Sequence, residues 1–232
     1  RIRNDAVLTL NSADGTFSGE TRPRGLAIRE NDDAGSTETY GSLVINSGTN
    51  YVTLEASGGS SAVSGLVAAT DWTRNNSATI NVRGRNLGAS SDASGRSTFK
   101  VADANDATMI AANVGAGGTI GGTSKTVSIV PWAIGENLTA GLADGNMGNT
   151  FLSYVDNRGF VPLHLTNEFA TYATAGNTNN TRESLTASLT GLAGRTLNSL
   201  VIDNNNTAMI NVTGSGAGQT LANTSGAFLF TI

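Results

Sequence analysis

The stretch Ser42-Leu43-Val44-Ile45-Asn46 indicates the fold class, because it nearly returns later in the chain as Ser199-Leu200-Val201-Ile202-Asp203. Each copy is followed by an Asn-rich turn and a second alternating stretch, Val52-Thr53-Leu54 after the first copy and Ile210-Asn211-Val212 after the second. Self-similarity of this kind is typical of a modular array built from one strand unit.

Short runs in which apolar and polar residues alternate recur along the chain, as expected for half-buried strands. Clusters of Gly, Asn, Ser and Asp separate them and favour turns. The runs expected to form strands are 7–10, 26–28, 43–45, 51–54, 80–82, 99–101, 127–130, 185–189, 197–202, 210–212 and 228–232. The sequence therefore predicts an all-β protein.

Composition narrows the class of protein further. The 232 residues include 29 Gly and 3 Pro, with 14% charged and 6% aromatic residues, which suits many short strands joined by glycine turns. The net charge of -4, with no cluster of lysines, argues against nucleic acid as a partner. The absence of cysteine excludes disulfides, thiol catalysis and thiolate zinc sites.

No apolar run reaches the roughly 18 residues that a membrane span needs, so we expect no membrane insertion by this segment. The chain starts at Arg1 without an initiator Met or a signal-peptide core, and a strand pattern runs to its last residue, Ile232. We therefore expect a fragment of a longer chain or array, whose ends are covered by more β-structure.

Two architectures fit the strand pattern: a β-sandwich with hairpins, and a solenoid whose turns stack on one another. Hairpin turn sequences are weak, and stacked turns would place Asn above Asn and Thr above Thr in side-chain ladders. The pattern favours a right-handed parallel β-helix, with the sandwich left open. We expect coils over 1–130 and 183–232 in one continuous solenoid domain, with Ile45, Leu54, Ile80, Val82, Ile129, Leu200, Ile202, Ile210 and Val212 pointing inward.

The segment between these coils departs from the rhythm. It contains two of the three prolines, one of the two tryptophans and the only histidine, together with a polar, glycine-rich loop over 135–149. We expect an irregular insertion over 131–182, with a loop-rich excursion from the solenoid around 131–172. A short helix is expected at 165–174, capped by Thr166 or Asn167.

An ordered series of segments between about residues 40 and 232 resembles the autotransporter-associated β-strand repeat proteins, which are long bacterial surface or secreted chains. The segments are 78–88 (Ala-Thr-Ile-Asn-Val-Arg-Gly-Arg-Asn-Leu-Gly), 127–136 (Val-Ser-Ile-Val-Pro-Trp-Ala-Ile-Gly-Glu), 151–156, 159–163, 168–170 and 197–200. The chain departs from the family pattern at Val161, where Arg is usual, and at Phe169, where Tyr is commoner. The resemblance implies a β-helical passenger with a structural or adhesive role, and it carries over no catalytic residues.

Several groups of residues are candidate binding sites. The acidic stretch Glu30-Asn31-Asp32-Asp33 and the pair Asp103 and Asp106 have oxygen ligands for calcium but lack the spacing of known calcium loops, so solvated turns are favoured. The stretch 117–126 superficially resembles a phosphate loop, but Ser124 stands where that loop needs Gly and a strand follows. His164 has no second imidazole or thiolate to complete a metal site.

The candidate catalytic residues form only isolated pairs in the sequence. A polysaccharide-cleaving β-helix needs carboxylates and a cation converging on one face, and the best candidates are Asp156 with Arg158 and Asp103 with Lys100. Trp72 and Trp132 are either sugar-stacking platforms or packing residues, and the sequence does not rank these two roles. We therefore expect no catalytic, cofactor or metal site.

The sequence thus predicts a non-enzymatic structural protein of the bacterial cell surface or extracellular space: a β-helical stalk, filament or matrix element with an adhesive role. The expected partners are further copies of itself or adjacent repeats stacked end to end, with surface glycans as a further partner. The alternative from another class is a glycan-binding or polysaccharide-degrading β-helix.

Overall fold

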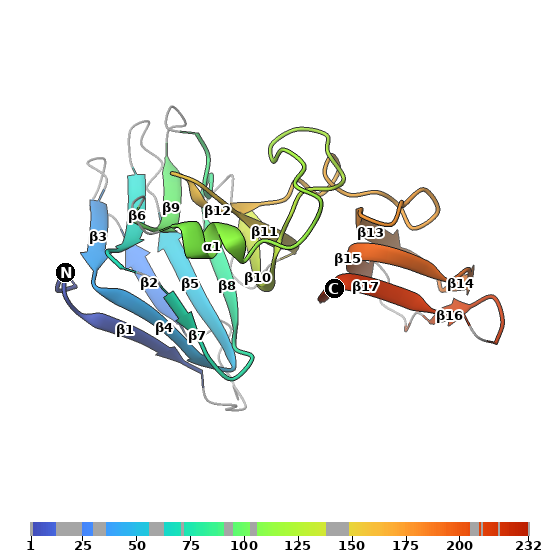
Figure 1. Ribbon diagram of the computed structural model, residues 1–232, viewed down its shortest axis with the longest axis horizontal. Helices are drawn as coiled ribbons and strands as arrows, with labels where there is room; N and C mark the ends of the chain where they lie inside the picture. The colour runs from blue at the N-terminus through green and yellow to red at the C-terminus, as the bar shows by residue number, and fades with distance from the viewer. Residues whose placement is uncertain are drawn as a thin grey trace. The chain divides into compact units, whose positions relative to one another are not determined.

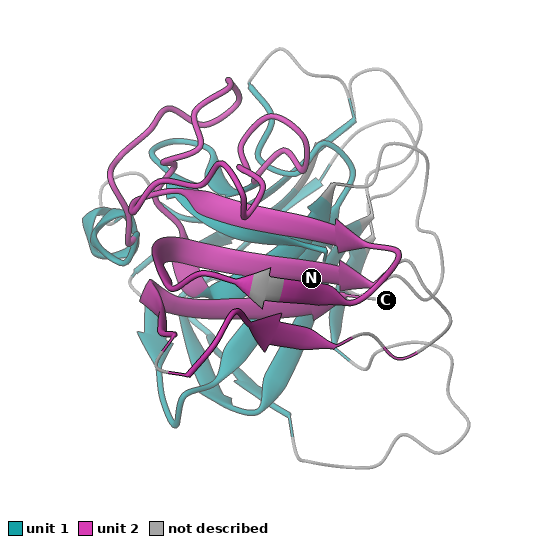
Figure 2. Ribbon diagram, turned by 90° about the vertical axis from the view of Figure 1, so that its right-hand side faces the viewer, with its two compact units in different colours: residues 1–113, 132–162 teal, residues 114–131, 163–232 magenta. Residues whose placement is uncertain are grey.

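The computed structural model of the protein is all-β, and the single helix in the part it describes is the short α1 (Ala107–Ala111) (Figure 1). The structure describes residues 2–12, 25–29, 36–55, 63–70, 72–90, 95–102, 106–137, 149–204, 209, 211–217 and 219–231. The chain forms two compact units (Figure 2). Unit 1 comprises residues 1–113 and 132–162, and unit 2 comprises residues 114–131 and 163–232.

Unit 1 contains three sheets that the chain visits three times in the same order. The first sheet contains β1 (Val7–Asn11), β4 (Ser42–Ser47) and β7 (Trp72–Arg74); the second begins with β2 (Leu26–Arg29), β5 (Thr49–Glu55) and β8 (Thr79–Gly84); the third contains β3 (Ser36–Tyr40), β6 (Val63–Ala68) and β9 (Arg96–Val101). All six pairings among these nine strands are parallel. Parallel neighbours separated by strands of two other sheets are incompatible with a meander of hairpins.

The second sheet continues with β10 (Val130–Asn137), β11 (Thr150–Val155) and β12 (Gly159–Pro162). β10 pairs parallel to β8, whereas β11 and β12 form an antiparallel hairpin. Asn157 and Gly159 in its turn adopt φ angles of 62° and 75°, a left-handed conformation that Asn and Gly tolerate best. The expected loop-rich excursion over 131–172 is therefore wrong for these three strands, which extend a sheet of unit 1.

Unit 2 alternates between two parallel sheets. One contains β13 (Asn180–Leu185), β15 (Arg195–Asn204) and β17 (Leu221–Thr231), and the other contains β14 (Leu189–Leu192) and β16 (Val212–Gly214). The expected strand at 127–130 is reduced to isolated bridges at Val127 and Ile129 until β10 begins.

The helix expected at 165–174 is wrong, because residues 165–167 and 172–174 form turns. A single helical turn is present: Nδ1 of His164 accepts from the amides of Thr166 and Asn167 at 3.2 Å, and its carbonyl accepts from the amide of Glu168 at 3.0 Å. The turn does not continue, because the amide of Ala170 donates to the carbonyl of Asn180 at 2.9 Å in a parallel bridge. The observed helix α1 was not expected, since its five residues are too short to show a helical period.

The expected inward residues mostly form the core. Ile45, Leu54, Ile80, Val82 and Ile129 are fully buried, and Leu200 and Ile202 are 3% and 5% exposed. Val212 is 42% exposed, so its expected burial is wrong; it lies on a three-residue strand that pairs on one side only. Ile210 lies outside the described residues. The burial of these seven residues confirms that the alternation of apolar and polar residues places the core side chains.

The expected side-chain ladders are present. In unit 1, Nδ2 of Asn75 donates to Oδ1 of Asn46 at 3.3 Å, and Nδ2 of Asn46 donates to Oδ1 of Asn11 at 3.4 Å. In unit 2, Nδ2 of Asn198 donates to Oδ1 of Asn180 at 2.8 Å. Asn75 and Asn46 continue the register of β7 and β4, whereas the register partners of Asn11 and Asn180 are Ser47 and Ser199, so those two amides bond to the Asn one position earlier.

Tyr40 is fully buried in unit 1, and it makes the free energy of unfolding depend on pH in alkaline solution. Burial raises the pKa of its phenol far above the ordinary value of 10.0. Above pH 10 the unfolded chain loses this proton and the folded chain keeps it, so the folded state binds more protons and the free energy of unfolding falls as pH rises. We expect a loss of up to ~1.4 kcal/mol per pH unit from this one group.

Denaturant titrations followed by tryptophan fluorescence measure this effect. Both tryptophans, Trp72 and Trp132, belong to unit 1, so the fluorescence signal reports that unit alone. Tyr40→Phe removes the proton in question and is expected to flatten the fall in stability above about pH 10. Equal slopes for the wild type and Tyr40→Phe would contradict the assignment.

Candidate functional site

Of the candidate calcium ligands, only Asp106 belongs to the described part of the chain. Glu30, Asp32, Asp33 and Asp103 lie outside the described residues, and Asp106 is a 6% exposed residue directly before α1. Among the residues that the structure describes, no three His, Cys, Asp or Glu side chains are close enough to hold a metal ion.

The catalytic pair Asp156 and Arg158 lies in the turn between β11 and β12. Asp156 is exposed, and Nε of Arg158 donates to the carbonyl of Gly88 at 2.6 Å. Of the second pair, Asp103 is outside the described residues, and Nζ of Lys100 lies 3.4 Å from the carbonyl of Asn157. Both described cations thus bond to backbone carbonyls around the same turn.

The tryptophans lie in an aromatic cluster of unit 1, formed by Trp72, Phe99, Trp132, Tyr154 and Phe160. Trp72 is 7% exposed, with its ring centroid 4.6 Å from that of Phe99. Trp132 is partly exposed, and the guanidinium of Arg74 lies 5.4 Å from its ring centroid. Burial favours a packing role for Trp72, and a cation occupies one approach to Trp132.

The stretch 117–126, compared above with a phosphate loop, forms turns in unit 2 that are bonded to a buried carboxylate. Glu168 is fully buried; its Oε1 accepts from the amide of Gly121 at 2.6 Å and its Oε2 from the amide of His164 at 2.7 Å. Nζ of Lys125 donates to the carbonyls of Thr166 and Asn167. These bonds give Glu168 and Lys125 structural roles in joining the two loops.

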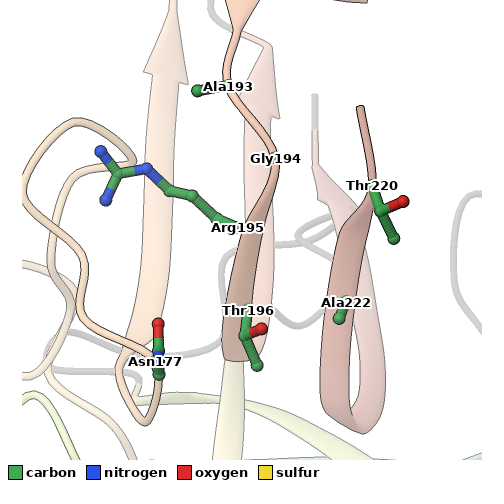
Figure 3. A pocket seen from close by; sticks show the side chains of 7 residues that line it. All are labelled: Asn177, Ala193, Gly194, Arg195, Thr196, Thr220 and Ala222. Carbon is green, nitrogen blue, oxygen red and sulfur yellow. The ribbon is translucent and has the colours of Figure 1, made fainter. Parts of the chain in front are cut away.

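A depression of about 480 Å³ belongs to unit 2 and is shown in Figure 3; it is lined by Asn177, Ala193, Gly194, Arg195, Thr196, Thr220 and Ala222. Figure 3 shows Arg195 extending away from Thr196, as expected for neighbours on a strand. Its guanidinium donates to the carbonyls of Ala173 and Ala175 at 3.1 and 2.7 Å, so it braces the chain.

The smaller depression, about 150 Å³, belongs to unit 1, and we call it the basic groove. It lies on the third sheet and the neighbouring β11–β12 turn, and is lined by Thr37, Gly65, Val67, Ala89, Arg96, Thr98, Lys100, Asn157 and Arg158. Three cations line this groove and no described lining residue is acidic. It brings together Lys100 and Arg158, which the sequence had assigned to two separate pairs.

Sequence reasoning missed two charged features. A buried ion pair joins Nε of Arg83 on β8 to Oε2 of Glu136 on β10 at 3.6 Å, with side chains 7% and 9% exposed. Arg96 lines the basic groove, and its Nε is buried without a hydrogen-bond partner among the described residues. Only strand register brings these residues to their neighbours, so no local motif marks them.

Comparison with protein-family models, curated proteins and solved structures finds no match to this chain. In the described portion, the structure contains no helix of the length and apolarity that crossing a membrane requires.

Proposed function

We propose that this chain is a non-enzymatic structural segment of an extracellular bacterial surface protein, in which parallel strands stack as a right-handed β-helix to build a stalk, filament or matrix element. The three visits to three sheets in unit 1 support the solenoid, because each visit adds one strand to each sheet. Parallel crossovers are right-handed in nearly all proteins, which supports the handedness.

The resemblance to autotransporter-associated β-strand repeat proteins supports a surface or secreted location and an adhesive role. The Asn and Thr ladders agree with the stacked strands of such repeat proteins, because they join like polar side chains of neighbouring strands.

The observation that carries the proposal is the apolar face of β17. In its parallel register with β15, Phe228 lies beside Leu200 and Phe230 beside Ile202. Leu200 and Ile202 belong to the buried core of unit 2, whereas Phe228 and Phe230 are 48% and 70% exposed. The two phenylalanines therefore continue the stacked core by one layer that no described strand covers.

β17 also pairs with only one strand in the described sheet order, β15. A long strand with one free edge and exposed apolar side chains is a template for pairing with another chain. We propose that further β-structure of the same kind, from a neighbouring repeat or a second copy, stacks here. A head-to-tail contact of this kind propagates into a fibre if it does not close.

Sedimentation of the 232-residue chain over a range of concentrations tests this function. We expect the wild type to self-associate as its concentration rises. For the double variant Phe228→Ser and Phe230→Ser, the concentration at which half of the chain is associated should rise about tenfold or more. The physical reason is that the variant removes the apolar area that stacking would bury.

Met209→Ser is the matched control, because Met209 is 85% exposed in unit 2 but lies outside β17. It is expected to leave the association unchanged. A wild-type chain that stays monomeric at high concentration would contradict the stacking proposal, and so would equal association of the wild type and the double variant.

A second candidate, glycan binding by the same scaffold, is favoured by one observation: the basic groove of unit 1.

A further inference from the structure

β7 and β9 are the last strands that the chain adds to the first and third sheets of unit 1, and each lies at an edge of its sheet. Trp72 of β7 lies in register beside Leu43. Phe99 of β9 lies in register beside Leu66. Because Leu43 and Leu66 are fully buried, the two rings continue the stacked core by one layer. We call Trp72 and Phe99 the end layer of unit 1.

The β11–β12 hairpin covers this end layer. The ring centroid of Phe160 lies 5.4 Å from that of Trp72 and 5.9 Å from that of Phe99. The ring of Tyr154 also reaches Trp72, with the centroids 6.4 Å apart. β12 packs against β9 (Figure 1). As a result, Trp72 is only 7% exposed and Phe99 is fully buried.

The corresponding position in unit 2 is exposed. Leu43 and Leu200 occupy the same place in the repeated Ser-Leu-Val-Ile stretch. Phe228 lies beside Leu200 as Trp72 lies beside Leu43. Phe228 is nevertheless 48% exposed. The burial of the aromatic residue in unit 1 therefore comes from the hairpin and not from its place in the stack.

The edge of β9 is occupied as well. The amide of Ser97 donates to the carbonyl of Arg85, and the carbonyl of Ser97 accepts from the amide of Gly88, both at 2.8 Å. The amide of Val101 donates to the hydroxyl of Tyr154 at 2.8 Å. These groups share the side of β9 that faces away from β6, because they lie an even number of positions apart. No further strand can pair with them while these bonds are in place.

Two glycines allow the hairpin to lie this close to the end of the stack. Gly159 of β12 adopts a φ of 75°, and a Cβ there would lie 2.2 Å from the carbonyl oxygen of Phe99. Gly88 adopts a φ of 62°, and its Cβ would lie 2.3 Å from the carbonyl oxygen of Phe160. A side chain at either position would push the hairpin away from the stack.

We propose that the β11–β12 hairpin is an autoinhibitory cap, which covers the end layer of unit 1 and keeps a second copy of the chain from pairing there. A strand edge with apolar side chains is a template for another strand, and proteins commonly cover such edges. Parallel pairing also stops at the cap, since β11 and β12 are antiparallel.

A second copy suits the uncovered end layer, because Trp72 and Phe99 carry no charge. Two copies of this layer can meet without burying an unpaired charge. The end layer belongs to unit 1, whereas the stacking face on β17 belongs to unit 2. The cap is therefore a separate feature from the stacking proposed above.

Gly159→Ala tests the cap, because it leaves every aromatic ring and every charge in place. It is made in the 232-residue chain that already carries Phe228→Ser and Phe230→Ser, so that association through β17 does not contribute. Gly117→Ala on the same background is the matched control. Gly117 adopts a φ of 79°, and nothing outside its chain neighbours lies within 4 Å of its Cβ position. The control thus has the same left-handed backbone strain without the clash.

Peptide-resolved hydrogen exchange at 150–162 should be faster in Gly159→Ala than in the control, whereas β4 and β5 should stay protected, because the cap opens while the stack stays folded. Tryptophan emission should shift to longer wavelength, since Trp72 loses its contacts with the hairpin. In sedimentation, the concentration at which half of the chain is associated should fall about tenfold or more relative to the control.

Tyr154→Phe is the second variant, and it decides the case if Gly159→Ala does not fold. It removes only the hydroxyl that accepts from Val101 and keeps the ring beside Trp72. We expect changes in the same directions but of smaller size, because one hydrogen bond is lost.

Three results would overturn the proposal. Exchange at 150–162 as slow in both variants as in the control would mean that these contacts do not hold the hairpin. An opened hairpin without stronger association would mean that it does not inhibit pairing. Loss of protection throughout unit 1 in both variants would make the hairpin part of the core and not a cap. A wild-type chain that stays monomeric contradicts only the stacking through β17, so the two proposals fail separately.

Discussion

Replacing Phe160 with alanine is expected to destabilise unit 1 by about 3–5 kcal/mol, the usual cost of removing a buried aromatic side chain. Phe160 is fully buried, and its ring centroid lies 5.4 Å from those of both Trp72 and Tyr154 and 5.9 Å from that of Phe99. These rings come from β7, β9, β11 and β12, so the substitution leaves a cavity where strands of different sheets of unit 1 meet.

Denaturant titration followed by tryptophan fluorescence measures this loss, because Trp72 and Trp132 both contact Phe160. The native spectrum should also change, since each indole loses a neighbour. Val7→Ala is the control: Val7 is an apolar residue of unit 1 that is 61% exposed, and its truncation is expected to change stability by less than about 0.5 kcal/mol. Similar losses for Phe160→Ala and Val7→Ala would show that the aromatic cluster does not hold unit 1 together.

Replacing Asn180 with alanine is expected to destabilise unit 2 by about 3 kcal/mol or more, because it leaves several buried polar groups without partners. Asn180 is fully buried. Its Nδ2 donates to the carbonyl of Val127, and its Oδ1 accepts from Nδ2 of Asn198 and from Oγ of Ser199, each at 2.8 Å. Alanine satisfies none of these three groups.

Amide hydrogen exchange resolved by peptide measures the effect in unit 2, which contains no tryptophan. Exchange in β13 and β15 should accelerate, whereas the fluorescence midpoint of unit 1 should stay unchanged. Asn211→Ala is the matched control, because Asn211 is an exposed residue of unit 2. Exchange in β13 as slow in Asn180→Ala as in Asn211→Ala would mean that the buried amide contributes little.

Much of the fold follows from local pattern. The alternation in Ser42-Leu43-Val44-Ile45-Asn46 predicts a strand with Ile45 inward, and Ile45 is fully buried in β4. The preference for parallel stacking and the ladder of Asn46 and Asn75 were also accessible, because repeated units that stack bring like residues of neighbouring strands together. These features depend only on period two and on repetition.

The failures of sequence reasoning share a cause. Segment 131–137 carries proline, glycine and polar residues that weaken the strand pattern, and segment 150–155 does not alternate between apolar and polar residues. β8 nevertheless offers β10 an edge along which the sheet extends. The helix expected at 165–174 stops after one turn, because the amide and carbonyl of Ala170 bond to the backbone of Asn180 and Arg182 instead of to the helix. In both cases long-range or side-chain hydrogen bonds outweigh weak local propensity.

The candidate site was the least accessible feature. Lys100 and Arg158 were each noted, but only beside a carboxylate close in sequence, and Arg96 was not noted at all. The charge of a groove depends on which strands are neighbours. The distance between two residues along the sequence does not show which strands these are.

By itself, therefore, the sequence determined the all-β class, the inward residues of β4, β5, β8 and β15, and the stacking of like polar side chains, because each of these follows from a period of two within a repeated unit. The tertiary structure alone decided how the chain divides into two units, which cations share a groove, and that Phe228 and Phe230 lie on an uncovered strand. The physical reason is that parallel pairing joins residues that are distant in the chain, and its register is set by the packing of whole sheets.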